Sequence, residues 1–162
     1  MSKPKSKQEF EDPTTGGRLF SVRFLVALVL IALGIVWVVL WTLYLRDVRG
    51  WESTLPREGS RPDALLPSMD KLDDWNWLVG FGLLFVGLTV AAHPSTPLGR
   101  GRGVLVGMLG CFVIGLIWIC TFYVFANKPE GEIPLLGDLG QLNLVVGIGF
   151  MAVGFAYATK WE

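Results

Sequence analysis

The sequence predicts an all-α membrane protein with four transmembrane helices, arranged as two helical hairpins that repeat in parallel orientation. Three observations support this fold class. Hydrophobic residues make up 52% of the 162 residues and charged residues only 17%, which is unusual for a water-soluble domain of this length. The apolar residues form four uninterrupted blocks, and two stretches of the chain recur at fixed offsets.

The four apolar blocks cover residues 24–45, 75–92, 104–126 and 142–159, and none of them contains Asp, Glu, Lys, Arg or His. At ~1.5 Å per residue, about 20 residues cross a hydrocarbon layer ~30 Å thick. Backbone amides in lipid must bond within their own segment, so each block is predicted to be a helix. Two blocks hold only 18 residues, and flanking residues are expected to complete their spans.

Residues 1–23 form a basic, polar tail in front of the first block. That block is too long for the core of a signal peptide, and Leu45-Arg46-Asp47 follows it where a cleavage site would have small residues. We therefore expect the first helix to remain as a membrane anchor.

The repeat is clearest in the two shorter blocks. Residues 73–87 read DDWNWLVGFGLLFVG and residues 140–154 read GQLNLVVGIGFMAVG, which match at an offset of 67. The longer blocks match through LGIVW at 33–37 and IGLIW at 114–118, at an offset of 81. The extra 14 residues lie in the first outer loop.

These offsets define the expected domains. The first hairpin covers 24–94 with an enlarged outer loop at 46–74, a short cytoplasmic linker covers 95–102, and the second hairpin covers 103–162. Pro94 and Pro97 stop the helix before the linker. A two-helix unit returns to the side where it began, so its repeats are parallel and predict a pseudo-two-fold axis along the membrane normal.

Charge bias predicts the orientation. The tail, the linker and the C-terminus together hold eight Lys or Arg residues and four acidic residues. The two outer loops hold six Lys or Arg residues and ten acidic residues. The compact Arg100-Gly101-Arg102 lies in the very short linker. Because basic residues favour the cytoplasmic side, both termini are predicted to be cytoplasmic.

Small residues repeat along one face of each short helix, at positions 80, 87 and 91 and again at 147, 154 and 158. Such stripes let helix backbones approach closely in lipid; alternatively, glycine is simply common in membrane helices. The residues expected to mediate helix packing or partner contact are Gly34, Trp37, Trp75, Asn76, Gly80, Gly87, Gly115, Trp118, Asn143, Gly147 and Gly154.

The polar and aromatic residues of the spans allow more than one interpretation. Asn76 and Asn143 can cap backbone amides, bond to a neighbouring helix or contact a partner. Asp73 and Asp74 complement a helix dipole or, less specifically, attract a cation. The tryptophans fit an interfacial aromatic belt, and His93 fits a plain interfacial residue.

The sequence contains no recognisable set of residues for catalysis or cofactor binding. It has no Cys/His cluster for a metal, no nucleophile–His–acid set and no phosphate loop with its lysine. Cys111 and Cys120 lie in one helix and are expected to be apolar packing residues. We therefore expect a protein that is not an enzyme, with no catalytic, cofactor-binding or metal-binding residues.

The motifs resemble those of the CrgA family of actinobacterial cell-division membrane proteins. The tail MSKPKSK, the segment 34–37, Trp75-Asn76 and the VGFG of 79–82 look like one member. A second member is suggested by the segment 115–118, Phe122-Tyr123-Val124, Asn143, the VGIG of 146–149 and Thr159-Lys160-Trp161. Family members usually have one hairpin, so this chain resembles a tandem-duplicated form.

The resemblance implies a non-enzymatic membrane scaffold of the division septum. It implies recruitment or regulation of the FtsZ ring and of peptidoglycan-synthesis partners such as the septal transpeptidase. The expected location is the plasma membrane, enriched at the septum, with the lipid bilayer and divisome proteins as partners, no nucleic acid, and self-association left open.

Two other functions remain open from the sequence. A small four-helix transporter matches in helix count, although these spans lack an intramembrane acidic residue. An accessory subunit of an unrelated membrane complex is the other alternative.

Overall fold

The computed structural model describes residues 21–54, 59–125 and 133–160, and all regular elements among these residues are helical. Two long helices, α1 (Val22–Ser53) and α4 (Arg102–Phe125), alternate with two shorter ones, α3 (Trp75–Ala91) and α6 (Leu142–Ala158). A very short helix precedes each shorter one: α2 (Pro67–Leu72) comes before α3, and α5 (Leu136–Leu139) before α6. The 3-10 turn η1 (Pro97–Gly99) lies between the two halves.

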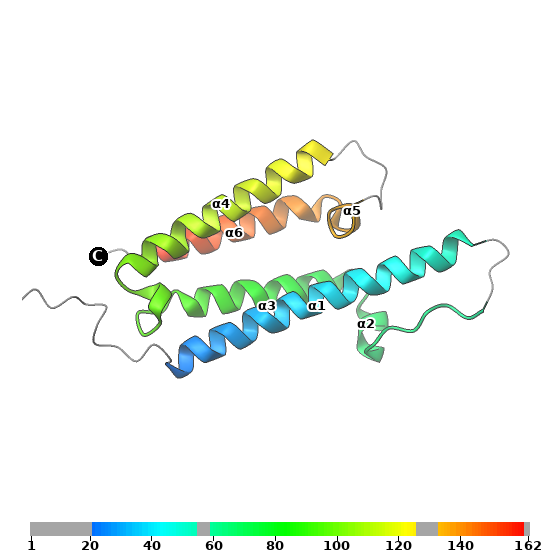
Figure 1. Cartoon of the computed structure of the whole chain (residues 1–162), viewed down its shortest axis with the longest axis horizontal. Coiled ribbons are helices and arrows are strands. Elements are labelled where there is room, and N and C mark those ends of the chain that lie inside the picture. Colours follow the sequence, from blue (N-terminus) through cyan, green and yellow to red (C-terminus); the bar gives the residue numbers. More distant parts are fainter. Residues whose placement is uncertain (1–20, 55–58, 126–132, 161–162) are drawn as a thin grey trace, which may run out of the picture.

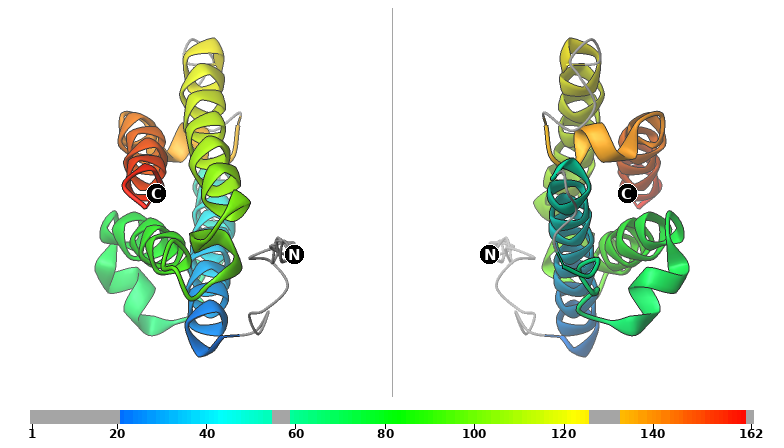
Figure 2. Two further views of the ribbon diagram at one scale, coloured as in Figure 1. Left: turned by 90° about the vertical axis from the view of Figure 1, so that its left-hand side faces the viewer. Right: turned by 90° about the vertical axis from the view of Figure 1, so that its right-hand side faces the viewer.

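The four main helices lie in a row (Figure 1). The long helices α1 and α4 form the two edges, and the short helices α3 and α6 lie between them. Helix α1 packs along α3, α4 packs along α6, and α3 touches α6. Both long helices run away from the η1 end and both short helices return to it, so the two hairpins point the same way (Figure 1). Seen end-on, α3 and α6 both lie to one side of α1 and α4, and α2 lies on that same side (Figure 2).

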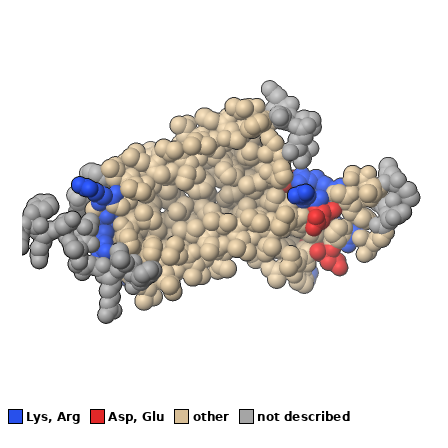
Figure 3. Space-filling view, viewed as in Figure 1, with Lys and Arg blue, Asp and Glu red and all other residues tan. Residues whose placement is uncertain are grey.

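The surface of the helices is that of a membrane protein. Helices α1 and α4 are long and apolar enough to cross a membrane, and only 22% and 17% of their most apolar stretches are buried, unlike the core helix of a soluble protein. Helices α3 and α6 are apolar and 17 residues long, which is about 25 Å. Charged side chains gather at the two ends of the row, and the band between them is free of them on the face in Figure 3.

Helix α1 extends past its apolar block. The block ends at residue 45, but the helix continues through residues 46–53 and stops at Thr54, whose backbone is extended. Helical propensity does not depend on apolarity, so this charged stretch can continue the helix into water. At the other end, the Ser21 hydroxyl accepts a hydrogen bond from the Phe24 amide, which caps the helix.

The linker between the halves is tightly packed around Thr96, which is fully buried. Its hydroxyl bonds to the carbonyl groups of Ala91 and His93 and accepts a bond from the Gly99 amide at 3.1 Å. Gly101 has a φ of +53°, which glycine adopts readily, and α4 begins at the next residue. This connection fixes the end of α3 against the start of α4.

Candidate helix-packing and interaction sites

Paired glycines bring the long and short helices of each half into backbone contact. A Cβ atom on Gly34 of α1 would lie 2.7 Å from the carbonyl oxygen of Gly80 on α3. In the second half, a Cβ atom on Gly115 of α4 would lie 2.6 Å from the carbonyl oxygen of Gly147 on α6. Both distances are well inside van der Waals contact, so these positions accept no side chain unless the helices separate.

A second pair of glycines contacts the same helices further along. A Cβ atom on Gly87 would lie 3.0 Å from the carbonyl oxygen of Ala27, and one on Gly154 would lie 3.3 Å from that of Met108. Ala27 and Met108 are 81 residues apart, the offset of the sequence repeat. Close backbone approach of this kind strengthens dispersion contact between helices in lipid.

The candidate tryptophans lie in different surroundings. Trp37 lies beside Gly80, and Trp118 meets the ring of Phe81 edge-on at a centroid distance of 6.0 Å, a contact between the two halves. The indole nitrogens of Trp37 and Trp118 are buried without a hydrogen-bond acceptor among the described residues. Trp75, by contrast, is 67% exposed at the start of α3.

The two asparagines are fully buried and make the same pair of hydrogen bonds. The Asn76 side-chain amide donates to the carbonyl oxygens of Met69, at 2.8 Å, and Asp73, at 2.7 Å. The Asn143 amide donates to those of Leu136, at 2.7 Å, and Gly140, at 2.8 Å. Each asparagine therefore fastens the short preceding helix, α2 or α5, to the first turn of α3 or α6.

This arrangement differs from a helix N-cap, in which the side chain accepts a bond. The N-cap positions belong to Asp74 and Gln141, and neither side chain makes a capping bond. The Oδ1 atoms of Asn76 and Asn143 are buried with no donor among the described residues.

The turn before each asparagine has the same backbone geometry. Asp73 has φ of 43° and ψ of −126°, and Gly140 has φ of 48° and ψ of −124°. This is the region that glycine adopts at the first central position of a type II′ turn. Asp73 is one of two non-glycine residues with positive φ in the described chain, so the first half carries strain here that Gly140 avoids in the second.

The Phe85 side chain of α3 packs against α6 at the interface between the halves. The Phe85 ring meets the Phe150 ring edge-on at a centroid distance of 5.1 Å. It also fills the space above Gly149, where a Cβ atom would lie 2.5 Å from the ring. The equivalent Gly82 has no neighbour within 4 Å of a Cβ position. The two halves are therefore unlike at their shared surface.

Two polar contacts also join the halves. The Tyr157 hydroxyl donates to the Leu88 carbonyl oxygen at 3.1 Å. Arg49, near the end of α1, forms a bidentate ion pair with Asp138 of α5, whose side chain is only 5% exposed. The sequence analysis did not identify these four residues, because no repeat or motif links positions 69 and 89 apart.

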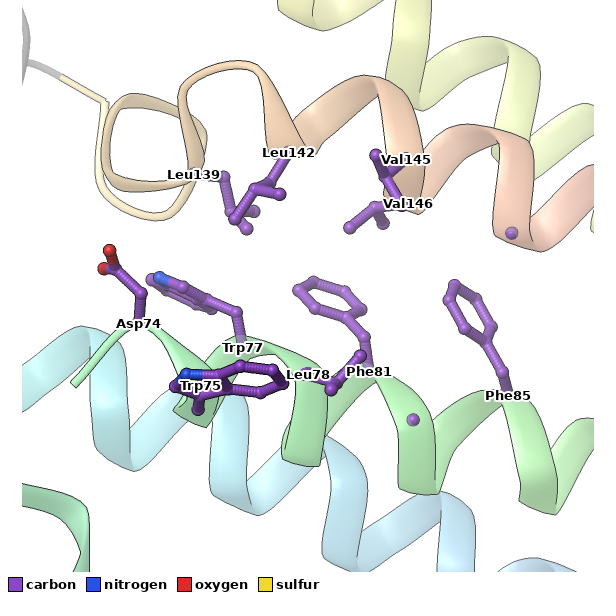
Figure 4. Close-up of a pocket in the computed structure, with 12 residues that line it drawn as sticks. Asp74, Trp75, Trp77, Leu78, Phe81, Phe85, Leu139, Leu142, Val145 and Val146 are labelled. Atoms are coloured by element: carbon purple, nitrogen blue, oxygen red, sulfur yellow. The ribbon is translucent and has the colours of Figure 1, made fainter. Parts of the chain in front are cut away.

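An apolar groove of about 500 Å³ opens between α3 and α6 at the end nearest α5. One wall carries Trp75, Trp77, Phe81 and Phe85, and the other carries Leu142, Val145 and Val146 (Figure 4). Asp74 lies at its outer end and is the one charged residue in its lining. Among the candidate residues, only Trp75 lines this groove.

The described residues contain no group of three or more His, Cys, Asp or Glu side chains that could hold a metal ion. Cys111 is buried and Cys120 is exposed, and both are free thiols. Among described residues, the site chemistry therefore consists of helix contacts, buried amides and the partly buried Arg49–Asp138 ion pair.

Comparison with known proteins identifies the family. The model of the family described as "Cell division protein CrgA" matches twice, over residues 2–93 and 98–162. The chain belongs to the CrgA family. The two CrgA matches follow one another along nearly the whole chain, as expected for a tandem-duplicated member of this cell-division family.

Curated CrgA relatives match shorter stretches. The chain is 46% identical to the cell division protein CrgA of Streptomyces avermitilis over 55 residues, which is 34% of this chain and 60% of that protein. It is 32% identical to those of two Mycobacterium strains, KMS and JLS, over 57 residues, which is 33% of this chain and 61% of each relative. The matches thus span about 60% of the length of these CrgA proteins. No solved structure matches the chain.

Proposed function

We propose that this chain is a non-enzymatic integral membrane scaffold of the cell-division septum, which recruits or regulates FtsZ-ring and peptidoglycan-synthesis partners. The observation that supports the proposal most strongly is the match to the cell-division family over two successive segments. The function is one of binding, in keeping with a sequence that lacks a recognisable catalytic set.

The proposed topology has four membrane spans in two parallel hairpins, with both termini and the linker in the cytoplasm. The parallel course of α1 and α4 supports this arrangement (Figure 1). So does the separation of charge: Arg23, Arg100, Arg102 and Lys160 mark one end of the row, and the acids of α2 and α5 mark the other. The helices thereby present apolar faces to lipid and to the membrane anchors of partners.

Within this proposal, the paired glycines and asparagines shape the surface that partners meet. They hold each hairpin together, so their role is to position exposed residues such as Trp75 and not to contact a partner directly. Residues 1–20 of the tail lie outside the described residues, and the basic composition of the tail suits contact with cytoplasmic division proteins.

The test is the location of a fluorescent fusion in dividing cells of the source organism, together with deletion of the gene. We expect a band at the septum and abnormal septa after deletion. A fusion spread evenly around the envelope, with normal septa in the deletion strain, would reject the proposal.

Matched variants connect the test to the structure. Substitution of Gly34 and Gly115 by Leu should disrupt both hairpins and reduce the septal band. The Gly110→Leu control places the same side chain where a Cβ atom has no neighbour within 4 Å, so its septal band should remain. A reporter fused after Glu162 that is active only outside the cell would contradict the proposed topology.

A further inference from the structure

The groove between α3 and α6 has a polar end and an apolar body. Its apolar length runs along α3 from Trp77 past Phe81 to Phe85, facing the aliphatic side chains of α6 (Figure 4). Asp74 and the indole rings of Trp75 and Trp77 lie at the other end (Figure 4). An amphipathic molecule would suit this groove, with its polar group at the Asp74 end and its apolar part along α3.

The length of the groove corresponds to one leaflet of a bilayer. Asp74 and Phe85 are eleven residues apart, or about 16 Å along a helix at 1.5 Å per residue. Half of a hydrocarbon layer ~30 Å thick is about 15 Å. A molecule that holds its polar group at Asp74 would therefore reach the middle of the membrane at Phe85.

The narrowness of the groove favours alkyl chains over a helix. The Trp77 and Phe81 side chains on one wall are only 3% and 8% exposed, and Val146 on the other wall is 4% exposed. A thin alkyl chain suits such a narrow groove better than a helix about 10 Å across.

The charge at the mouth favours a cationic head group. Asp74 forms no ion pair with any described residue, whereas Asp138 of α5 is paired with Arg49. Asp73 adds a second carboxylate to the same turn. An ammonium group placed here gains electrostatic attraction, and an anionic head group is repelled.

We propose that the groove binds one phospholipid of the phosphatidylethanolamine type, with its ammonium group at Asp74 and its acyl chains against Phe81 and Phe85. The inference rests on the membrane topology of the proposed function. The site is specific to the tandem form, because α3 of the first half and α6 of the second supply its two walls. The walls are also unlike each other. Positions 75, 77, 81 and 85 are aromatic, whereas their repeat equivalents 142, 144, 148 and 152 are Leu, Leu, Ile and Ala.

The test uses the full chain in bilayer nanodiscs that contain phosphatidylethanolamine with a photoreactive acyl chain. After illumination, mass spectrometry maps the labelled residues, and a parallel sample contains phosphatidylglycerol with the same photoreactive chain. We expect label concentrated on the groove segments of α3 and α6, with more label from phosphatidylethanolamine. Asp74→Asn should reduce that preference about two- to fivefold, the effect of losing one exposed ion pair.

Matched leucine variants test the groove itself. Gly82 lines the groove and has no neighbour within 4 Å of a Cβ position, so Gly82→Leu fills the groove without forcing helices apart. This variant should lose most of the groove label, whereas Gly110→Leu on α4 should keep it. Unfolding midpoints close to that of the parent chain establish that both variants are folded.

Equal labelling of all lipid-facing surfaces, unchanged by Gly82→Leu, would overturn the site. Equal groove labelling by the two lipids would overturn the head-group assignment, and a partner helix cross-linked in the groove in place of lipid would overturn the occupant. Failure of the proposed function is distinguishable: an evenly spread fusion would reject the septal role while leaving the nanodisc labelling unchanged.

Discussion

The carbonyl oxygen of Gly80 occupies the space that a side chain on Gly34 would need, 2.7 Å from the position of its Cβ atom. The Gly115–Gly147 pair repeats this relationship at 2.6 Å. The obstacle is backbone in both cases, so it cannot rotate away as a flexible side chain could. The contact between the long and short helices of each half therefore requires glycine, which has no side chain, at positions 34 and 115.

Substitution of Gly34 by Ala should destabilise the first hairpin by about 1–3 kcal/mol, the usual cost of overpacking a close contact. Gly115→Ala should cost a similar amount in the second. The measurement is the unfolding midpoint of the purified chain in mild detergent. Gly110→Ala is the control, where added helix propensity should be neutral or stabilising by up to ~1 kcal/mol. Equal midpoints for Gly34→Ala and Gly110→Ala would show that the contact is not tight.

Replacement of Asn76 by Asp should release α2 from α3. The substitution exchanges an amide donor for a carboxylate oxygen facing the carbonyl oxygens of Met69 and Asp73. Loss of buried hydrogen bonds in this way costs about 1–3 kcal/mol per unsatisfied group. Hydrogen exchange of the residues in α2 should accelerate, while α4 and α5 should be unaffected.

The second half supplies the control for this prediction. Asn143→Asp should accelerate exchange in α5 and leave α2 protected, because its amide bonds to Leu136 and Gly140. Global acceleration in either variant would mean that the asparagine supports the whole bundle and not one local turn.

Replacement of Asp73 by Gly should stabilise the chain. Asp73 has a φ of 43° that favours glycine, and Gly140 has nearly the same φ and ψ in the second half. Relief of such backbone strain is worth about 1 kcal/mol or more, offset in part by the extra freedom of glycine in the unfolded chain. The reciprocal variant, Gly140→Asp, should be destabilising, and opposite signs in denaturant titrations of the two variants are the expected result.

Removal of one partner of the Arg49–Asp138 pair should weaken the contact between the halves. Arg49→Ala leaves the nearly buried Asp138 without its cation, a change that typically costs ~3–5 kcal/mol for a fully buried pair and less here, because Arg49 is 37% exposed. A double-mutant cycle with Asp138→Ala should give a favourable coupling energy in unfolding experiments. Strict additivity of the two single variants would contradict a direct interaction.

The sequence predicted close helix approach at Gly80 and Gly87 and their equivalents, but not which neighbour each glycine or asparagine meets. Gly80 and Gly82 recur equally well, at 147 and 149, yet Gly80 contacts α1 whereas Gly82 faces open space. Which glycine faces a neighbour depends on the rotation of each helix about its axis, and neighbouring helices set that rotation. The extents of α3, α4 and α6, in contrast, differ from the predicted apolar blocks by at most two residues at either end.

Several polar contacts were beyond sequence reasoning for a different reason. Asn76 and Asn143 bond to carbonyl groups seven residues earlier only because a positive-φ turn folds α2 and α5 back. Arg49 and Asp138 are 89 residues apart and belong to elements that no motif connects. Such contacts emerge from tertiary packing, and a single sequence carries no local signal for them.

The eight helical residues that follow the apolar block of α1, residues 46–53, form a helical extension about 12 Å long. In the proposed topology, the segment after Ser53 would start about 12 Å beyond the membrane-spanning part of α1. In that topology, a partner that binds the enlarged loop would meet it at a distance from the bilayer set by the length of this helical extension. Deleting or inserting a few residues in this extension would change that distance. It would also change the direction in which the loop leaves the helix, since each residue turns the helix by about 100°.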